Sequence, residues 1–280
     1  MKIITQSFIK SLFKYKEGKA CGLQFEAQFI NNIEFPSSDA MNLGSWFEYM
    51  CTGQTTKFGH IPEPTRLKAK KLTKAEIESG MKQEDQIGEL SKKYKDALCH
   101  VEAFKQMIEA CDYEIVATGE RIVDKELGIQ GDVDITVRKR GDKDGRVIFI
   151  DTKFSGLLDN KWDERGWADE SLEYKHDIMI QAVHYKLLGF QKYGYEPDFF
   201  FWVFSSTNTT DRKNIRVNVD SEYFGKHQAS IVQARQAFEA YKAKGWIARP
   251  KPKRCGNCPL RDKCPHFISL PVEQTVFYGG

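Results

Sequence analysis

The stretch GIQGDVDITVRKRGDKDGRVIFIDTKFSG, residues 128–156, sets the fold. Two apolar runs flank a charged turn bracketed by glycines, a pattern typical of a β-hairpin. Asp132 and Asp134 lie in the first run, and Asp151 and Lys153 close the second. If the strands pair symmetrically about the middle of the turn, Asp134 faces Asp151 and Asp132 faces Lys153.

This pairing predicts a charged patch on one face of the sheet. Directly opposed residues point to the same face, with Cβ atoms roughly 4.5–5.5 Å apart. Carboxylates this close repel unless a charge neutralises them. A divalent cation does so, and oxygen ligands suit Mg²⁺ or Mn²⁺. The alternatives are a surface hairpin with solvated charges, or a bulge that breaks the register.

The same residues resemble the core of the PD-(D/E)xK nuclease superfamily. That family places an Asp on one strand and (D/E)-x-K on the next, as Asp134 and Asp-Thr-Lys 151–153 do here. The resemblance implies that Asp134 and Asp151 are metal ligands and that Thr152 contributes its backbone carbonyl. It implies that Lys153 is the catalytic lysine.

Helical residues extend the resemblance. Gln181 and Tyr185 share one face of a helix and match the Q-x-x-x-Y motif of the RecB-like branch. Glu48, in LGSWFE, matches the acid on the first core helix and is implied as the third metal ligand, with Gly44 permitting close approach. Glu89 is the rival acid, and Glu120 is expected to be structural.

The elements expected along the chain give an α/β fold, in which a central mixed β-sheet is flanked by helices as in a restriction-endonuclease-like core. Residues 1–280 are expected to form one nuclease domain. The expected helices are 42–52, 73–110 with possible division at Gly80 and Gly88, 171–192 and 221–243; the expected strands are 114–123, 129–138, 146–152, 197–206 and 214–220.

Three of the seven cysteines, Cys255, Cys258 and Cys264, form a C-x2-C-x5-C pattern near the C-terminus. This spacing is a metal signal. It resembles the AddB-type iron–sulfur nucleases, in which a distant N-terminal cysteine completes a [4Fe–4S] cluster. The resemblance implies that Cys21 joins the segment 245–280 through the cluster as a metal staple.

Other ligand sets are possible for the terminal cysteines. Cys51 is second choice for the distant ligand, because it follows the Glu48 motif rather than preceding it. Zinc is the rival metal, because His266 would complete a local Cys₃His site. A thiol-redox enzyme is disfavoured, because no βαβ pattern precedes the cysteines.

The composition is that of a globular protein. It is compatible with binding to DNA. The net charge is only +3, so phosphate contacts would come from local basic runs such as 68–74 and 249–254. Trp162 and Trp167 either stack on unpaired bases or cap the core. No apolar run spans a membrane and the N-terminus lacks a signal-peptide pattern, so we expect a cytoplasmic protein of a bacterium or a phage-infected cell.

These patterns predict a metal-dependent DNA exonuclease in recombination, repair or phage DNA metabolism. DNA is the expected partner, and a recombination or single-strand-annealing protein is a possible protein partner. The alternative is a non-catalytic nucleic-acid-binding protein with a zinc knuckle.

Overall fold

The structure is a computed structural model of the chain, and it describes residues 3–35, 37–53, 63–68, 71–79, 81–82, 88–156, 158–160, 166–168, 176–251, 255–256 and 258–267. The chain forms two compact units, which are described separately. Unit 1 contains Met1–Ile3 and Ser37–Phe224, and unit 2 contains Ile4–Pro36 and Gly225–Gly280. The single domain expected over residues 1–280 remains a prediction.

Unit 1 is built on a five-stranded mixed sheet in the order β1-β2-β3-β4-β5. The neighbouring strands are antiparallel except for β3 and β4, which run parallel. A parallel pair needs a crossover connection, and helix α7 (His176–Tyr193) lies between these two strands in the chain. The strands are β1 (Tyr113–Asp124), β2 (Ile129–Lys139), β3 (Ile148–Ser155), β4 (Asp198–Ser205) and β5 (Arg212–Arg216).

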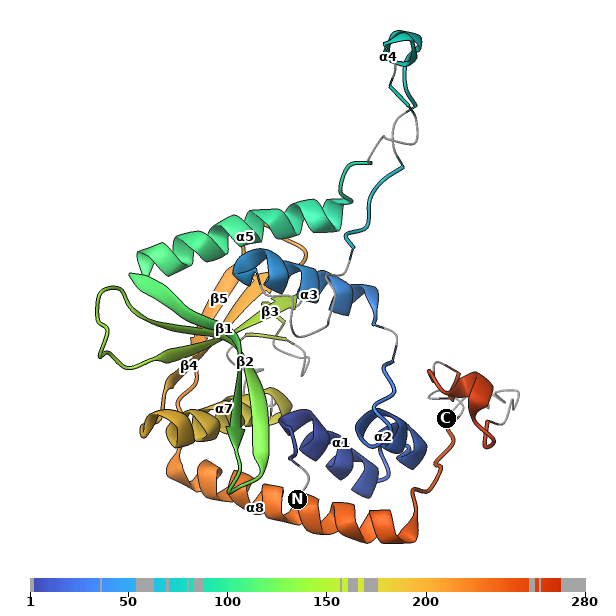
Figure 1. Ribbon diagram of the computed structural model, residues 1–280, viewed down its shortest axis with the longest axis vertical. Helices are drawn as coiled ribbons and strands as arrows, with labels where there is room; N and C mark the ends of the chain where they lie inside the picture. The colour runs from blue at the N-terminus through green and yellow to red at the C-terminus, as the bar shows by residue number, and fades with distance from the viewer. Residues whose placement is uncertain are drawn as a thin grey trace, which may run out of the picture. The chain divides into compact units, whose positions relative to one another are not determined.

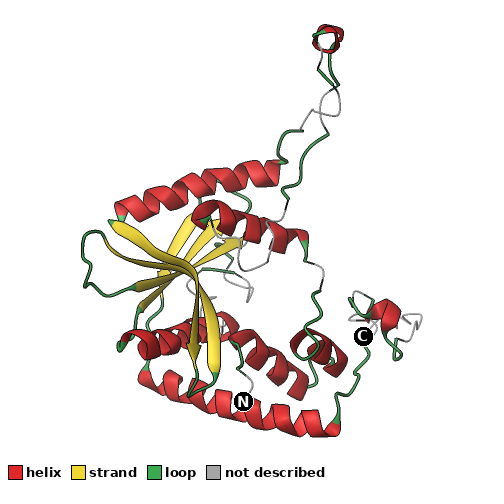
Figure 2. Cartoon of the chain, viewed as in Figure 1, coloured by secondary structure: helices red, strands yellow, loops and turns green. Residues whose placement is uncertain are grey.

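Helices cover both faces of this sheet (Figures 1 and 2). Helices α3 (Asp39–Thr52) and α5 (Lys92–Ala110) pack on the face that carries Ile135, Ile150 and Trp202, and all contribute to one apolar core. Helix α7 covers the opposite face, where the Tyr185 ring stacks on Phe199. A short helix, α4 (Lys74–Glu78), precedes α5. The mixed sheet flanked by helices is therefore as predicted.

The sequence explains these elements locally. Helix α5 buries Tyr94, Ala97, Val101, Phe104 and Ile108, which recur at the helical spacing of three and four residues. Strand β4 is a continuous apolar run, as expected of a strand covered on both faces.

Helix α3 has a defined start and end. The Ser38 hydroxyl accepts a hydrogen bond from the backbone N–H of Met41, and Gly53 ends the helix at φ +70°. The cap explains why α3 begins three residues before the expected Asn42. The strand expected at 214–220 is displaced, because pairing with β4 covers Arg212–Arg216.

Unit 2 contains α1 (Gln6–Lys16), α2 (Gly22–Phe29), the part of α8 (Ser221–Lys244) from Gly225 onward, and a 3₁₀ turn at Arg261–Lys263. Its core is aromatic: the Phe8 ring lies 5.1 Å from Phe25 and 5.3 Å from Phe238. Trp246 packs on Phe25 at 4.6 Å between ring centroids. Trp246, two residues after α8, thus packs on both α1 and α2. Within the described part of the chain, no helix combines the length and apolarity needed to cross a membrane.

Candidate active site

Strands β2 and β3 pair in the predicted register. The pairs are Ile135 with Ile150, Thr136 with Phe149 and Val137 with Ile148. Asp134 and Asp151 are the next positions beyond the last pair, and the Gln181 amide on α7 reaches Asp151, so Asp151 points to the face covered by α7. The exposed fractions of Asp134 and Asp151 are only 4% and 1%. The two strands therefore bring two buried carboxylates to adjoining positions.

The carboxylate of Asp151 is held by two side chains. Lys153, two residues along β3, forms an ion pair with Oδ1. The amide of Gln181, on α7, donates a hydrogen bond to Oδ2. Burying a carboxylate is costly unless it is paired and hydrogen-bonded. Lys153 and Gln181 thus offset the free-energy cost of burying the Asp151 carboxylate and fix its orientation.

Asp132 has a charged partner on β1, and its expected place opposite Lys153 stays a prediction, because the β2–β3 pairs end at Ile135 and Ile150. Its carboxylate binds the guanidinium of Arg121 on β1, at 2.7 Å from Nε to Oδ1 and 3.3 Å from Nη2 to Oδ2. The β2–β3 pairing stops at Ile135, whereas the β1–β2 pairing continues through Asp132. At this position, β1 therefore supplies the partner.

Tyr185 supports β2 through the strand's backbone. Its hydroxyl donates a hydrogen bond to the backbone carbonyl of Asp132, at 2.9 Å. A Cβ added at Gly131 would lie 2.5 Å from Cε1 of the Tyr185 ring, so only glycine fits there. Sequence reasoning missed Gly131, although an isolated glycine inside a strand signals a close approach.

Two candidates for a third acid have different surroundings. Glu48 is half-buried on α3. Glu89 is exposed and pairs with Lys95 at 2.6 Å. Within the described ranges, no three His, Cys, Asp or Glu side chains are grouped closely enough to hold a single metal ion. The third ligand and the Thr152 carbonyl stay predictions.

Two neighbouring residues complete the surroundings. A Cβ added at Gly44 would meet no described protein atom within 4 Å, and the close approach expected there stays a prediction. Glu120 accepts hydrogen bonds from Thr136 at 3.3 Å and Tyr193 at 3.0 Å and pairs with Lys192. It ties α7 to the sheet, which fits the structural role expected of it.

Trp167, in the segment after β3, packs against the sheet. Trp167 is 3% exposed and packs on Phe201, at 5.6 Å between ring centroids. The core-cap alternative therefore holds for Trp167, and Trp162 lies outside the described residues. The basic run 68–74 is described only in part.

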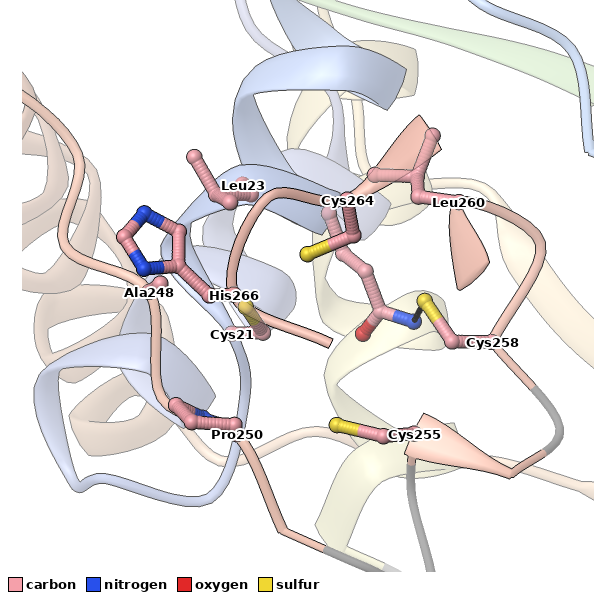
Figure 3. A pocket seen from close by; sticks show the side chains of 10 residues that line it. Cys21, Leu23, Ala248, Pro250, Cys255, Cys258, Leu260, Cys264 and His266 are labelled. Atoms are coloured by element: carbon pink, nitrogen blue, oxygen red, sulfur yellow. Dashed lines mark hydrogen bonds between the residues drawn. The ribbon is translucent and has the colours of Figure 1, made fainter. Parts of the chain in front are cut away.

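The four cysteines implied by the resemblance line one pocket of unit 2 (Figure 3). Cys21 comes from the N-terminal segment, and Cys255, Cys258 and Cys264 come from the C-terminal segment. His266 also lines the pocket, with apolar side chains that include Leu23 and Leu260. Sulfur donors from both ends of the chain are thus collected around one hollow.

Short contacts dock the C-terminal segment against Cys21. The Gly22 N–H donates to the carbonyl of Ile247 at 3.1 Å, and a Cβ on Gly22 would lie 2.6 Å from that oxygen. The Arg249 N–H donates to Cys21 Sγ at 3.5 Å. The Arg249 guanidinium lies over the Tyr15 ring, 4.6 Å from its centroid. This arginine of the second basic run is therefore occupied within unit 2; residues 252–254 are outside the described ranges.

The remaining cysteines have other surroundings. Cys51 lies on α3 in unit 1, where burial first and the charge of Glu48 second raise the pKa of its thiol well above the ordinary value. A thiol kept protonated is a poor metal ligand. Cys99 is exposed on α5, and Cys111 is half-buried after it. The surroundings of Cys51 favour Cys21 as the distant cysteine.

One solved structure supports the fold. A protein described as "Putative exonuclease" from Eubacterium rectale shares 15% identity, with a TM-score of 0.57 over 97% of this chain and 91% of the other. A second structure, SSO0001, shares 17% identity over 61% of this chain and 69% of its own, with a TM-score of 0.31. No curated protein matches the chain.

The family assignment comes from the sequence as a whole. A model of the PD-(D/E)XK nuclease superfamily matches residues 11–265, which include Asp134, the Asp-Thr-Lys segment and the terminal cysteines. The match covers far more than half of the chain and agrees with the sheet and its paired carboxylates. The chain belongs to the PD-(D/E)XK nuclease superfamily.

Proposed function

We propose that the protein is a metal-dependent deoxyribonuclease that acts as an exonuclease in recombination, repair or phage DNA metabolism. The observation that carries the proposal is the pair of buried carboxylates, Asp134 and Asp151, on neighbouring strands, with Lys153 bound to Asp151. In a member of a nuclease superfamily, this arrangement supports phosphodiester hydrolysis.

The donor chemistry of the site fits a hard divalent cation. Asp134 and Asp151 would hold Mg²⁺ or Mn²⁺, with Glu48 and the Thr152 carbonyl as the further proposed ligands. A bound cation supplies Lewis-acid charge to the scissile phosphate.

The protein's own residues have distinct tasks in this proposal. Gln181 orients Asp151 through its amide, and Tyr185 holds β2 through the Asp132 carbonyl. Lys153 carries the positive charge that stabilises negative charge developing on the phosphate. Preorganised charge of this kind is effective because it needs no rearrangement during the reaction.

The DNA substrate is part of the proposal. Its support is the family, together with the description of the Eubacterium rectale protein as an exonuclease. A recombination or single-strand-annealing protein would be the protein partner. We place the protein in the cytoplasm of a bacterium or a phage-infected cell, where thiols stay reduced.

We further propose that Cys21, Cys255, Cys258 and Cys264 hold a [4Fe–4S] cluster, joining segment 245–280 to the rest of a single nuclease domain over residues 1–280. Four cysteine sulfurs around one pocket are the donor set of such a cluster. Zinc is the alternative metal, because His266 lines the same pocket and would complete a Cys₃His site.

End-labelled DNA digestion tests the nuclease proposal. Wild type should degrade DNA with Mg²⁺ or Mn²⁺ and not with EDTA. Asp151→Asn and Lys153→Ala should each lose roughly 100-fold or more of the rate, as expected when a charge-stabilising group is removed. Lys143→Ala is the matched control, because Lys143 is exposed in the turn that joins the same two strands.

The product pattern separates the alternatives. Mononucleotides released progressively from one labelled end support an exonuclease. DNA that stays intact in wild type, but is bound by it, would instead support the non-catalytic nucleic-acid-binding protein. Wild-type rates in folded Lys153→Ala would remove the lysine from the mechanism.

A further inference from the structure

The cysteine pocket contains a hydrogen-bond donor that no sequence motif marks. The side-chain amide of Gln24 donates from Nε2 to Cys258 Sγ at 3.2 Å (Figure 3). The two residues are 234 positions apart in the chain. The amide group of Gln24 lines the same pocket as the four cysteines, so the contact belongs to the pocket rather than to the surface.

The start of α2 places this donor. Cys21 is the N-cap residue of α2, and Gln24 lies in its first turn. The helix therefore presents one pocket sulfur and one amide donor together. Its start is pressed against the backbone of Ile247 through Gly22, whose added Cβ would meet that carbonyl at 2.6 Å. Gln24 is thus fixed relative to the C-terminal segment by backbone contacts.

A donor aimed at a cysteine sulfur stabilises negative charge on that sulfur. Hydrogen bonds to charged acceptors are stronger than those between neutral groups. Reduction of an iron–sulfur cluster adds negative charge that its ligand sulfurs share, and hydrogen bonds to the sulfurs help to set the reduction potential. The donor therefore favours the reduced form over the oxidised form.

We propose that Gln24 is a positioning residue of this pocket, whose amide donates to the ligand sulfur of Cys258 and raises the reduction potential of the cluster. This inference rests on the proposed [4Fe–4S] cluster and not on nuclease activity. A second donor of the same kind is the Arg249 N–H, which lies 3.5 Å from Cys21 Sγ. Being a backbone group, it would persist when Gln24 is changed.

Potentiometric titration of the anaerobically purified protein tests the role of Gln24. Gln24→Leu removes the donor and keeps a side chain of similar size, so its potential should become more negative while its iron content stays unchanged. Gln24→Glu removes the donor and adds negative charge, so its shift should be larger in the same direction. Gln28→Leu is the matched control, because Gln28 is exposed one turn further along α2.

Each outcome has one meaning. An unchanged potential in Gln24→Leu with full iron content would overturn the inference and leave the cluster in place. Loss of iron from both Gln24 variants, with Gln28→Leu loaded, would assign Gln24 to cluster assembly and overturn its tuning role. A colourless wild type that contains zinc would overturn the cluster and the inference together, without affecting the DNA digestion assay.

Discussion

Asp151 is the residue on which the proposed chemistry depends, and its orientation is set from outside its own strand. Gln181 reaches it from α7, in the next helix along the chain. A hydrogen bond to a charged group contributes roughly 1.5–3 kcal/mol, which corresponds to a factor of about 10–100 in rate or affinity. Gln181 is therefore expected to act on the cation site through Asp151.

The variant Gln181→Leu should raise the Mg²⁺ or Mn²⁺ concentration needed for half-maximal activity and lower kcat by roughly 10-fold. The KM for DNA should change little, because the amide is bound to the carboxylate. Gln191→Leu is the control, since Gln191 is exposed on the same helix. Metal titrations of DNA hydrolysis measure the effect, and an unchanged metal requirement in Gln181→Leu would contradict it.

His184, one residue before Tyr185, is fully buried and gives the protein a pH-dependent stability. Its Nε2 donates to the Gln130 carbonyl at 3.1 Å, and burial lowers its pKa to about 4. In the unfolded chain the pKa is near 6.5, so the unfolded state binds more protons between pH 6.5 and 4. The stability that His184 contributes is present above pH 6.5 and is lost as the pH falls toward 4, by about 3 kcal/mol.

Urea unfolding at a series of pH values measures this loss. Gln at position 184 keeps an amide donor and does not titrate, so His184→Gln should flatten the fall in unfolding free energy between pH 6.5 and 4. The variant itself costs stability at pH 7 through its altered packing. Parallel pH profiles for wild type and variant would show that another group is responsible.

At the scale of elements, the contact between β2 and α7 depends on Gly131, which has no side chain. Gly131 leaves space for the Tyr185 ring, and a Cβ there would lie 2.5 Å from Cε1 and 3.0 Å from the Leu188 side chain. Gly131→Ala should lower the free energy of unfolding by about 1–3 kcal/mol, as overpacking does. It should also lower DNA hydrolysis, because β2 carries Asp134.

Gly44→Ala provides the opposite case on α3. No described atom lies within 4 Å of the added Cβ, and alanine favours a helix over glycine by roughly 0.8–1 kcal/mol. This variant should therefore be as stable as wild type or more so. Urea unfolding of both variants compares them directly, and equal midpoints for the two would refute the role given to Gly131.

The hairpin register is the part of the site that the sequence predicts best. Glycines and charges mark the turn, and its symmetry places Ile135 opposite Ile150, as observed. The place where that ladder ends was not predictable from the turn. The Arg121–Asp132 pair belongs to the neighbouring β1–β2 hairpin, whose register runs without a shift from Asp124–Ile129 to this pair.

Across the whole molecule, what the sequence could predict depended on how far apart the partners lie in the chain. The C-x2-C-x5-C spacing is local and marks the terminal cysteines directly. Cys21 was found through family order, whereas Gln24 at Cys258 and Arg249 at Cys21 have no local signal. Those contacts form only when segments more than 220 positions apart are brought together in unit 2.

This long-range closure gives the last prediction. A cluster bound by Cys21 and the C-terminal cysteines would close a loop of more than 200 residues within the covalent chain, and long closures remove the most freedom from the unfolded state. By analogy with a cross-link of that length, the closure contributes roughly 5–6 kcal/mol. For a protein of this size, loss of the closure corresponds to a fall in Tm of roughly 10 °C.

Cys21→Ser and Cys258→Ser should therefore lose iron, visible absorption and thermal stability together. Cys99→Ser, which changes an exposed thiol on α5, should match wild type in all three. Iron analysis and thermal unfolding of the same anaerobic preparations decide the matter: a Cys21→Ser protein that retains four irons and the wild-type Tm would show that the N-terminal cysteine is not a ligand, and that the C-terminal segment is held by the packing of Trp246, Ile247 and Arg249 alone.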